Sequence, residues 1–307
     1  MIDRPKQRQV SGMNIRQLEV FRAVLQTGTT KGASHILNVS QPAVSTMIQH
    51  TEDQLGLSLF ERVRGRLVPT EAALILFAES SPIFSLFDSL QKKVEDLRNS
   101  KGGSIRITAT PSLANSILPL AVQKFSATRP DVRISIDMRD RETVLSYVAR
   151  GVSEIGLLLE FQDHPSLGCT PIHQSRFVCA IRRDHALASK EEIHISDLRG
   201  VSIVKLERGS VLGNLIDSKF SDLGEQPHWT VETRYCQTAC ALVQAGTTAA
   251  IVDAYVTLGP NCPDVVFRPL VPKIPVHSFI VYANDRPLSR MAKLLIAELR
   301  ATELGID

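Results

Sequence analysis

A change of hydrophobic period near residue 101 constrains the fold of this chain more than any other feature. Before it, the apolar residues recur three and four positions apart, as in helices, and beyond it short apolar runs alternate with helical segments. Lys101-Gly102-Gly103-Ser104 provides a flexible break between the two patterns. A chain of 307 residues has room for about two domains. We therefore expect an all-α N-terminal domain followed by an α/β domain.

The segment 13–70 predicts a winged helix-turn-helix domain, with the helix-turn-helix itself at 30–49. Apolar residues at spacings of three and four mark a first helix, and a second short helix follows Thr29-Thr30. Ser40 is a good N-cap for a third helix, because its hydroxyl can accept a hydrogen bond from the first turn. Two short runs around Arg64-Gly65 then suit a β-hairpin, which forms the wing.

Positive charge is concentrated at this end of the chain. Residues 1–70 carry nine Lys or Arg side chains against five Asp or Glu, although the net charge of the whole chain is only +3. A basic end favours a polyanion such as double-stranded DNA. The exposed face of the third helix begins polar and neutral, which suits a major groove, where Gln can pair with adenine. The alternative is an ordinary solvated helix face.

We expect DNA contacts from the helices and from the wing. The helical candidates are Thr30, Ser40, Gln41, Pro42, Ser45, Thr46, Gln49 and His50. In the wing, Arg62, Arg64 and Arg66 alternate, so a period of two would point all three the same way, toward phosphate or the minor groove. The alternative is a basic edge strand whose charges protect it from aggregation.

A long helical pattern at 71–100 links the two domains. Its apolar side repeats at spacings of three and four and forms a seam that requires a partner helix. The seam residues are Ala73, Leu76, Ser80, Ile83, Phe87, Leu90, Val94 and Leu97. Pro82 should kink this helix or end its first half. The seam either packs on its own domain or pairs with a second copy of the chain as a dimerisation helix.

The segment 104–307 predicts two α/β lobes that share one hinge, as in periplasmic binding proteins. Strands and helices alternate from Ile105 onward, with a helix expected at Leu113–Thr128 and the first strand of the second lobe at Phe177–Arg182. We place lobe I at about 104–174 and 278–307 and lobe II at about 175–277.

Ligands of two-lobed α/β folds lie beyond the carboxyl ends of the strands. Thr110 and Ser112 follow the first strand and open a helix, so their hydroxyls and the free backbone donors would suit an anion at a positive helix N-terminus. Simple N-capping is the alternative for both residues. The other candidate ligand contacts are Leu113, Arg139, Arg141, Phe161, Ser210, Gly246 and Thr247.

The sequence offers little support for catalysis or for a metal. The chain has no G-x-S-x-G, no H-E-x-x-H and no phosphate-binding loop motif, and its five cysteines include no C-x-x-C pair. We expect no enzyme activity, no cofactor and no metal site. The polar, basic N-terminus does not resemble a secretory signal, and no apolar run reaches the ~20 residues that a membrane helix needs. We therefore expect a cytoplasmic protein without a membrane segment.

Three stretches resemble the signature of the LysR-type transcriptional regulators. They are RQLEVFRAV at 16–24, VSQPAVS at 39–45 and LGLSLFER at 55–62. The resemblance extends over the whole chain and implies a regulator that binds a promoter inverted repeat as a homodimer or homotetramer. It also implies RNA polymerase as a further partner and an effector-responsive activator as the function.

The wing is similar to those of the regulators of lysine biosynthesis and of opine catabolism within this family. That similarity favours a small amino-acid-like or organic-acid ligand. The competing hypothesis is a soluble two-lobed solute-binding or enzymatic α/β protein with an incidental helical N-terminal domain. A binding protein of the periplasmic kind would need an export signal, which the N-terminus does not resemble.

Overall fold

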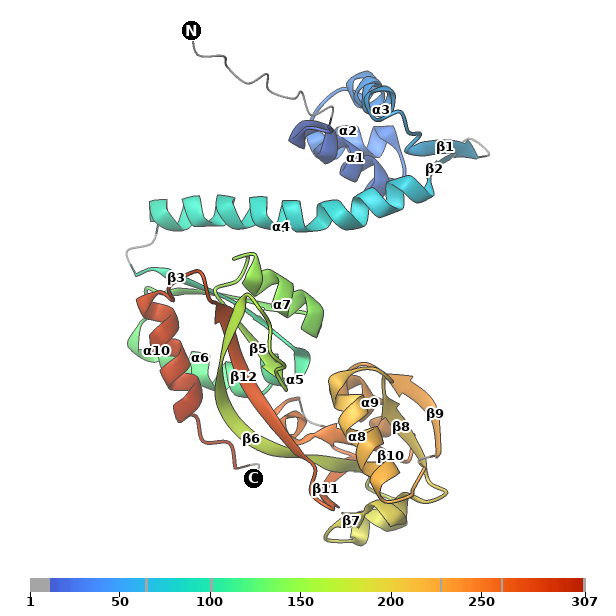
Figure 1. The fold of residues 1–307 in the computed structure, drawn as a ribbon, viewed down its shortest axis with the longest axis vertical. Coiled ribbons are helices and arrows are strands. Elements are labelled where there is room, and N and C mark those ends of the chain that lie inside the picture. Colours follow the sequence, from blue (N-terminus) through green and yellow to red (C-terminus); the bar gives the residue numbers. More distant parts are fainter. Residues whose placement is uncertain (1–11, 64–65, 100–101, 227, 261, 306–307) are drawn as a thin grey trace. The chain divides into compact units, whose positions relative to one another are not determined.

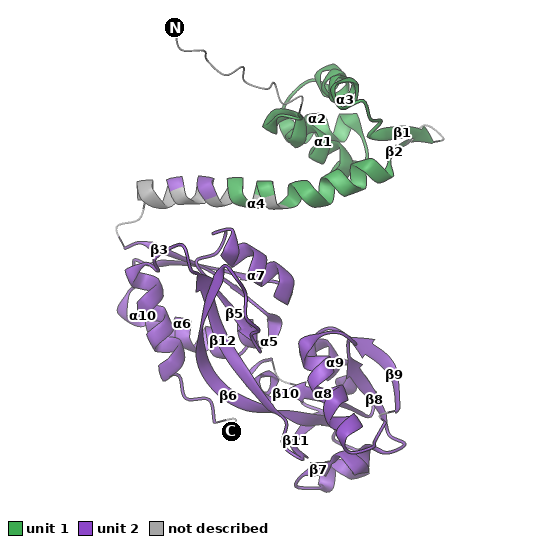
Figure 2. Ribbon diagram, in the orientation of Figure 1, with its two compact units in different colours: residues 1–88 green, residues 89–307 purple. Residues whose placement is uncertain are grey.

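A computed structural model of the chain describes residues 12–63, 66–99, 102–226, 228–260 and 262–305 (Figure 1). The chain forms two compact units, residues 1–88 and 89–307 (Figure 2). The boundary between the units falls inside helix α4, Glu71–Asn99. Each unit is described by itself below.

The first unit packs three helices and a two-stranded hairpin around one small core. The elements are α1 (Ile15–Thr27), α2 (Thr30–Leu37), α3 (Gln41–Leu55), β1 (Phe60–Val63) and β2 (Arg66–Pro69). The buried apolar side chains come from every helix and from the start of the wing, and they include Phe21, Val24, Ala33, Val44, Ile48 and Leu59. The predicted winged helix-turn-helix is confirmed.

Helix α4 continues through Pro82, so the expectation that this proline ends the first half of the helix is wrong. A proline inside a helix removes one backbone hydrogen bond, and a single loss can be absorbed where the flanking turns are satisfied. The bond that Pro82 removes is the one that its N–H would make to the Ala78 carbonyl oxygen, which is a single loss within the helix.

The apolar seam of α4 divides into two parts. Ala73 and Ser80, near its start, are buried in the first unit. Farther along, Ile83, Phe87, Leu90 and Val94 are exposed, with exposed fractions of 50%, 37%, 58% and 47%. The Leu97 side chain lies outside the described part of the structure. The first part of the seam thus packs on its own domain, and the second part presents apolar side chains to solvent.

Lobe I of the second unit is a sheet with helices on both faces (Figure 1). Its strands are β3 (Ser104–Ala109), β4 (Arg133–Met138), β5 (Ile155–Leu159), β12 (Pro275–Ala283) and the first part of β6 (Leu167–Arg182). Helices α6 (Ile117–Thr128) and α10 (Arg290–Ala301) cover one face, and α7 (Arg141–Ala149) covers the other. Ile155 and Leu157 pack toward the first pair and Leu158 toward α7, because successive strand residues face opposite sides.

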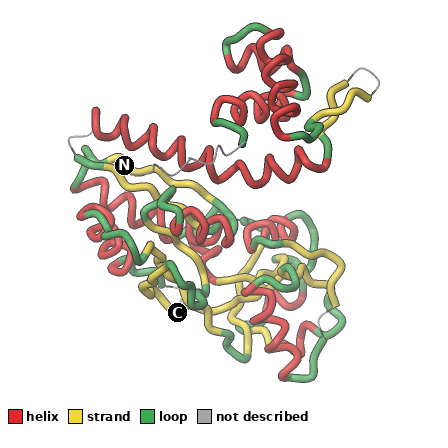
Figure 3. The backbone as a smooth tube through the Cα atoms, turned by 45° about the horizontal axis from the view of Figure 1, so that its top comes forward, coloured by secondary structure: helices red, strands yellow, loops and turns green. Residues whose placement is uncertain are grey.

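Strand β6 joins the lobes. Its residues 167–176 pair with β12, and its residues 177–182 pair with the strands of lobe II. Lobe II comprises β7 (Ile193–His194), β8 (Ser202–Leu206), α8 (Val211–Asp222), β9 (His228–Thr233), α9 (Cys236–Gln244), β10 (Ala249–Asp253) and β11 (Val265–Val271). Figure 3 shows strands and helices alternating through both lobes. The predicted two-lobed α/β domain is confirmed.

Several local expectations need correction. The single helix expected at Leu113–Thr128 is in fact two helices, α5 (Pro111–Ala114) and α6. Pro119 favours a helix that begins at Ile117, because proline is tolerated in the first turn of a helix. The strand expected at Phe177–Arg182 is only the second part of β6. The first part of β6 and all of β11 were not expected, since neither is a continuous apolar run.

Candidate nucleic-acid interface and inter-lobe cavity

Two N-caps and one left-handed residue define both ends of α2 and the start of α3. Thr29 Oγ1 accepts a hydrogen bond from the Gly32 backbone N–H at 2.9 Å, and Ser40 Oγ accepts one from the Ala43 N–H at 3.4 Å. Asn38 ends α2 with a φ of 52°, a conformation that asparagine tolerates better than most residues. These contacts confirm that the third helix begins after a Ser40 cap.

The face of α3 opposite the core is exposed and uncharged over its first turns. Val44 and Ile48 are buried. The exposed predicted contacts are Ser40, Gln41, Pro42, Ser45, Thr46 and Gln49. Thr30 is half-buried and accepts a 3.4 Å hydrogen bond from the Gln41 amide. Such a face can offer neutral donors and acceptors to base edges without repelling phosphates.

His50 lies at the flank of this face, against α1. The Gln17 amide nitrogen is 3.2 Å from His50 Nδ1 and donates to Gln54 Oε1 at 2.9 Å. Gln17 is 1% exposed, so this small network holds α3 on α1 from inside the domain. Only the second ring nitrogen of His50 can therefore serve the predicted DNA contact.

The Glu52 carboxylate joins the wing to α3. Its Oε1 accepts hydrogen bonds from the backbone N–H groups of Leu59 at 2.7 Å and Phe60 at 3.0 Å. At the base of the hairpin, Thr70 Oγ1 donates to the Ser58 carbonyl oxygen at 2.8 Å. The two chain segments at the base of the wing are thus joined to each other, and the first of them is tied to α3.

The hairpin register corrects the prediction that the wing arginines point the same way. Arg62 pairs with Leu67, and Val63 pairs with Arg66. Because neighbouring positions on a strand face opposite sides, positions 62 and 66 fall on opposite faces of the hairpin. A period of two holds within one strand, but the chain reverses between these residues. Arg64 and the side chain of Arg66 lie outside the described residues, so for Arg66 only the backbone register is given.

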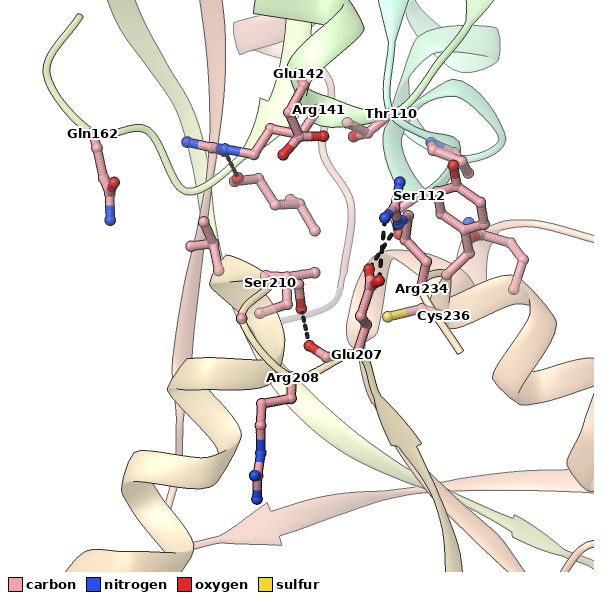
Figure 4. Close-up of a pocket in the computed structure, with 17 residues that line it drawn as sticks. Thr110, Ser112, Arg141, Glu142, Gln162, Glu207, Arg208, Ser210, Arg234 and Cys236 are labelled. Atoms are coloured by element: carbon pink, nitrogen blue, oxygen red, sulfur yellow. Dashed lines mark hydrogen bonds and ion pairs between the residues drawn. The ribbon is translucent and has the colours of Figure 1, made fainter. Parts of the chain in front are cut away.

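The second candidate site is a cavity of about 540 Å³ between the two lobes (Figure 4). The strand ends and helix starts that follow β3, β4, β5, β8 and β9 converge on it, as expected for a two-lobed α/β fold. Lobe I contributes Thr110, Pro111, Ser112, Arg141, Glu142, Leu159 and Gln162. Lobe II contributes Glu207, Arg208, Gly209, Ser210, Val211, Leu212, Arg234, Tyr235, Cys236 and Gln237.

Four of the predicted ligand contacts line this cavity, namely Thr110, Ser112, Arg141 and Ser210. Gly246 and Thr247 do not. They precede β10 and so lie at its amino end, whereas the cavity lies at the carboxyl ends of the strands. Predicting them as ligand contacts was therefore wrong, because the rule that ligands lie at strand ends applies to carboxyl ends only.

The remaining predicted contacts also lie off the cavity. Leu113 is fully buried in the core of lobe I. Arg139 forms an exposed ion pair with Asp137 at 3.0 Å. Phe161 packs on Phe279, with ring centroids 6.3 Å apart. None of these three side chains is part of the cavity lining.

The sequence reasoning missed the wall of the cavity that follows β9. Arg234, Tyr235, Cys236 and Gln237 follow that strand and open α9, in the same way that Thr110 and Ser112 follow β3. The sequence places a strand at Thr230–Glu232, so the strand-end rule would have identified them if it had been applied to the end of that strand.

The polar lining of lobe II is largely paired. The Arg234 guanidinium binds the Glu207 carboxylate through two hydrogen bonds of 2.7 and 3.1 Å. This pairing holds the pKa of Glu207 below its ordinary value. Ser210 Oγ donates to the Glu207 carbonyl oxygen at 2.7 Å and accepts from the Gly213 N–H at 3.0 Å, so Ser210 caps α8.

Thr110 and Ser112 are not ordinary N-caps. The Thr110 hydroxyl makes no capping bond, and its Oγ1 is buried with no hydrogen-bond partner among the described residues. Ser112 Oγ instead donates to Asp253 Oδ2 at 2.7 Å. Helix α5 has only four residues, so the expected positive helix N-terminus is weak.

Asp253 lies behind the cavity wall at the carboxyl end of β10 and is fully buried. It bonds Ser112 of lobe I, and Cys236 of lobe II also hydrogen-bonds to it. Burial raises the pKa of the Asp253 carboxyl, while the hydrogen bonds from Ser112 and Cys236 act in the opposite direction. One buried carboxyl thus contacts a cavity-lining residue from each lobe.

Asp253→Asn should change how stability depends on pH. In the unfolded chain this carboxyl has a pKa near 3.8, and in the folded chain its pKa is higher. Its contribution to stability is complete below pH 3.8 and is lost as the pH rises toward the folded-state pKa. The asparagine variant cannot ionise there, so its unfolding midpoint should gain on that of the parent chain as pH rises.

Thermal unfolding of both chains between about pH 4 and pH 9 measures this difference. Asp197→Asn is the control: the Lys190 hydrogen bond lowers the pKa of Asp197 below 3.8, so its contribution to stability changes only in more acidic solution and its difference from the parent chain should stay constant over this range. A constant difference between Asp253→Asn and the parent chain across this range would contradict the assignment.

The buried thiols are not poised for nucleophilic chemistry. Burial raises the pKa of Cys179 and of Cys240 to about 12, and it raises that of Cys236 as well. Thiols with such pKa values stay protonated near neutral pH. Among the described residues, no group of three or more His, Cys, Asp or Glu side chains is arranged to hold a metal ion. In the same ranges, no helix combines the length and apolarity that a membrane crossing requires.

Comparison with known proteins agrees with this architecture. Residues 15–74 match the bacterial regulatory helix-turn-helix protein, lysR family, and residues 98–303 match the LysR substrate binding domain. Regulatory protein NocR of Agrobacterium fabrum is 34% identical over 289 residues, which cover 94% of this chain and 95% of NocR. The octopine catabolism/uptake operon regulatory protein OccR of Rhizobium meliloti is 30% identical over 244 residues, 78% of this chain and 80% of OccR.

The fold has a close solved counterpart. The crystal structure of CbnR, a LysR family transcriptional regulator, superposes with a TM-score of 0.77 at 22% identity and covers 94% of this chain and 98% of CbnR. The two family models together match residues of both units. The chain therefore belongs to the LysR family of DNA-binding transcriptional regulators.

Proposed function

We propose that this regulator binds a promoter inverted repeat and that a small ligand in the inter-lobe cavity controls it. The observation that carries the proposal is the cavity of about 540 Å³, which is lined from both lobes in a chain that also has a DNA-binding unit. A ligand that touches both lobes stabilises one lobe arrangement over others and so shifts their populations. By linkage, the ligand and the DNA change each other's affinity by the same factor.

The bound form on DNA is a homodimer or homotetramer. The exposed apolar part of the α4 seam, around Ile83, Leu90 and Val94, supports pairing with a second copy. Reading an inverted repeat requires two recognition helices, one for each half-site. Activation, with RNA polymerase as a partner, extends the proposal from what the family resemblance implies.

The ligand is a small amino-acid-like or organic-acid molecule. The name of OccR ties that relative to octopine, an amino-acid derivative, and this supports the first class. The cavity contacts proposed from the sequence and kept here are Thr110, Ser112, Arg141 and Ser210, all of which line the cavity. The domain bounds proposed are 13–70 for the winged domain, 71–100 for the linker and 104–307 for the effector domain.

We place the regulator in the cytoplasm, where its DNA is, and assign it no enzymatic activity. The paired Glu207 and Arg234 and the protonated thiols support the latter, since none is an activated nucleophile or base. A two-lobed binding protein or enzyme with an incidental helical domain is the competing class. It predicts no specific DNA binding.

Fluorescence anisotropy with the DNA that flanks its own gene tests the proposal. The affinity should fall steeply with salt, because each phosphate contact releases a counterion. Arg62→Ala should reduce the slope of log affinity against log salt by about one per subunit. Arg199→Ala, which removes an equal charge in the second unit, should leave the slope unchanged.

Weak, salt-insensitive binding that does not distinguish this fragment from random DNA would favour the competing class. An unchanged slope for Arg62→Ala would instead leave the regulator in place and remove the wing from its DNA contacts.

A further inference from the structure

The charged residues of the cavity differ in whether they already form an ion pair within the protein. Glu207 and Arg234 neutralise each other through two hydrogen bonds. Arg208 lines the cavity edge, but its side chain extends away from Arg141 and Arg234 (Figure 4). Arg141 and Glu142, both from the start of α7, are the charged lining residues that remain.

Arg141 is oriented by backbone groups and not by an acid. Its Nη1 donates to the carbonyl oxygens of Leu159, at 2.9 Å, and Glu160. Burial lowers the pKa of the guanidinium, with Glu142 and Glu160 acting in the opposite direction. Among the described residues, no carboxylate lies within ion-pair distance of Arg141, so its positive charge is left for a bound molecule.

Glu142 carries the complementary charge on the same lobe. Consecutive helical residues point about 100° apart, which explains why Arg141 and Glu142 do not form an ion pair with each other. Glu142 is exposed and hydrogen-bonds to the neighbouring Asp140 side chain, and it has no ion pair with a cation within the described part of the chain. Glu207 is the main reason that the pKa of Arg234 is raised, and Glu142 contributes to that rise from the opposite lobe. Its charge therefore acts across the cavity.

Neutral polar atoms of the wall match this mixed character. The Gln237 side chain has an N–H donor and a carbonyl acceptor, and both are buried with no hydrogen-bond partner among the described residues. Thr110 Oγ1 is also buried and has no partner there. Leaving such atoms unpaired is unfavourable, so small side-chain rotations that pair them with a ligand would favour binding. Together they offer a ligand both donors and acceptors.

The unused charges, one positive and one negative, discriminate between ligand classes. A dicarboxylate would find one free guanidinium and would face Glu142 as well, so one of its charges would be desolvated without a partner. A diamine would meet the reverse problem at Arg141. A molecule with one carboxylate and one cationic nitrogen can satisfy both side chains.

We propose that the effector is a zwitterion whose carboxylate binds Arg141 and whose cationic nitrogen binds Glu142. This inference rests on the proposed effector function and narrows it to the amino-acid-like class. The cavity, at about 540 Å³, falls within the range of small-molecule sites and leaves space for a substituent between or beyond the two charged groups.

Three compounds of equal length test the charge pattern on the full chain. They are 5-aminopentanoate, which is zwitterionic, glutarate, which is a dianion, and 1,5-diaminopentane, which is a dication. At matched millimolar concentrations, 5-aminopentanoate should raise the thermal midpoint by about 2 °C or more, and the other two should not. Titration calorimetry then supplies the dissociation constants.

Variants of the two charged residues should redirect the preference. Glu142→Gln should weaken 5-aminopentanoate about tenfold or more and improve glutarate relative to it, because the repelling charge is gone. Arg141→Gln should improve 1,5-diaminopentane relative to 5-aminopentanoate in the same way. Arg199→Gln, at a residue of lobe II that pairs with Glu225 and is not part of the cavity lining, is the control and should change neither ratio.

The outcomes separate this inference from the function on which it rests. If glutarate binds the parent chain as well as 5-aminopentanoate does, or if Glu142→Gln leaves their ratio unchanged, the zwitterion assignment is overturned while effector binding stands. If neither these probes nor a small-molecule cell extract shifts the thermal midpoint, the effector function itself fails.

Discussion

Phe21→Ala is expected to unfold the DNA-binding unit while the second unit stays folded. The Phe21 side chain is fully buried, and its ring lies 5.9 Å from that of Phe60, where α1 meets the wing. Removing a buried phenylalanine costs about 3–5 kcal/mol, through lost burial and the cavity that remains. Small domains have total stabilities of only about 5–15 kcal/mol. The loss should therefore abolish DNA binding at growth temperature.

Chemical denaturation with probes in each unit would measure the effect. The transition of the first unit should move to much lower denaturant, and that of the second unit should not move. Ile36→Ala is the matched control, because Ile36 is 63% exposed and its truncation should change stability by less than about 0.5 kcal/mol. A Phe21→Ala loss of under about 1 kcal/mol would show that this core is not what holds the unit together.

Thr46→Glu is expected to abolish specific DNA binding without affecting the fold. Thr46 is exposed on the face of α3 that we assign to the major groove, so truncation or substitution leaves the core intact. A carboxylate there would be brought among phosphates in each half-site of an inverted repeat. With a loss of at least 1–3 kcal/mol per half-site, the affinity of a dimer should fall about 100-fold or more.

Gln26→Glu adds the same charge to an exposed position of α1 and serves as the control. Its affinity should fall only slightly, by long-range repulsion that salt screens. Equal losses for the two variants would mean that net charge, and not the α3 face, sets the affinity. Circular dichroism and thermal unfolding of both variants would verify that neither change acts through the fold.

The helix-turn-helix could be predicted from local signals because its determinants are close together in the sequence. Ser40 caps α3 through a bond to a residue three positions on, and Asn38 reverses the chain two residues earlier. Apolar spacing fixed which side of α3 is buried, and the structure places Val44 and Ile48 there. No contact between distant segments is needed to predict this part of the fold from the sequence.

The cavity was only half predictable. Thr110, Ser112, Arg141 and Ser210 could be located because each follows a strand or begins a helix that the apolar pattern reveals. Glu207, Arg234 and Gln237 follow β8 and β9, so the strand-end rule could have brought them to the cavity, but the pairing of the first two depends on β8 and β9 lying side by side in lobe II. The pairing of Glu207 with Arg234, 27 residues apart, follows from that register and from no sequence spacing.

The local structures follow from the sequence alone. They are the capped helices, the wing, the long linker helix and the alternating strands and helices. These follow from periodicity and turn chemistry, which act over a few residues. Three features could be seen only in the folded chain. Positions 62 and 66 face opposite sides of the wing, and β6 pairs with strands of both lobes. Ser112 hydrogen-bonds to Asp253, which is 141 residues away in the sequence. Contacts of that kind depend on strand register and lobe packing, which bring together side chains that have no relation along the chain.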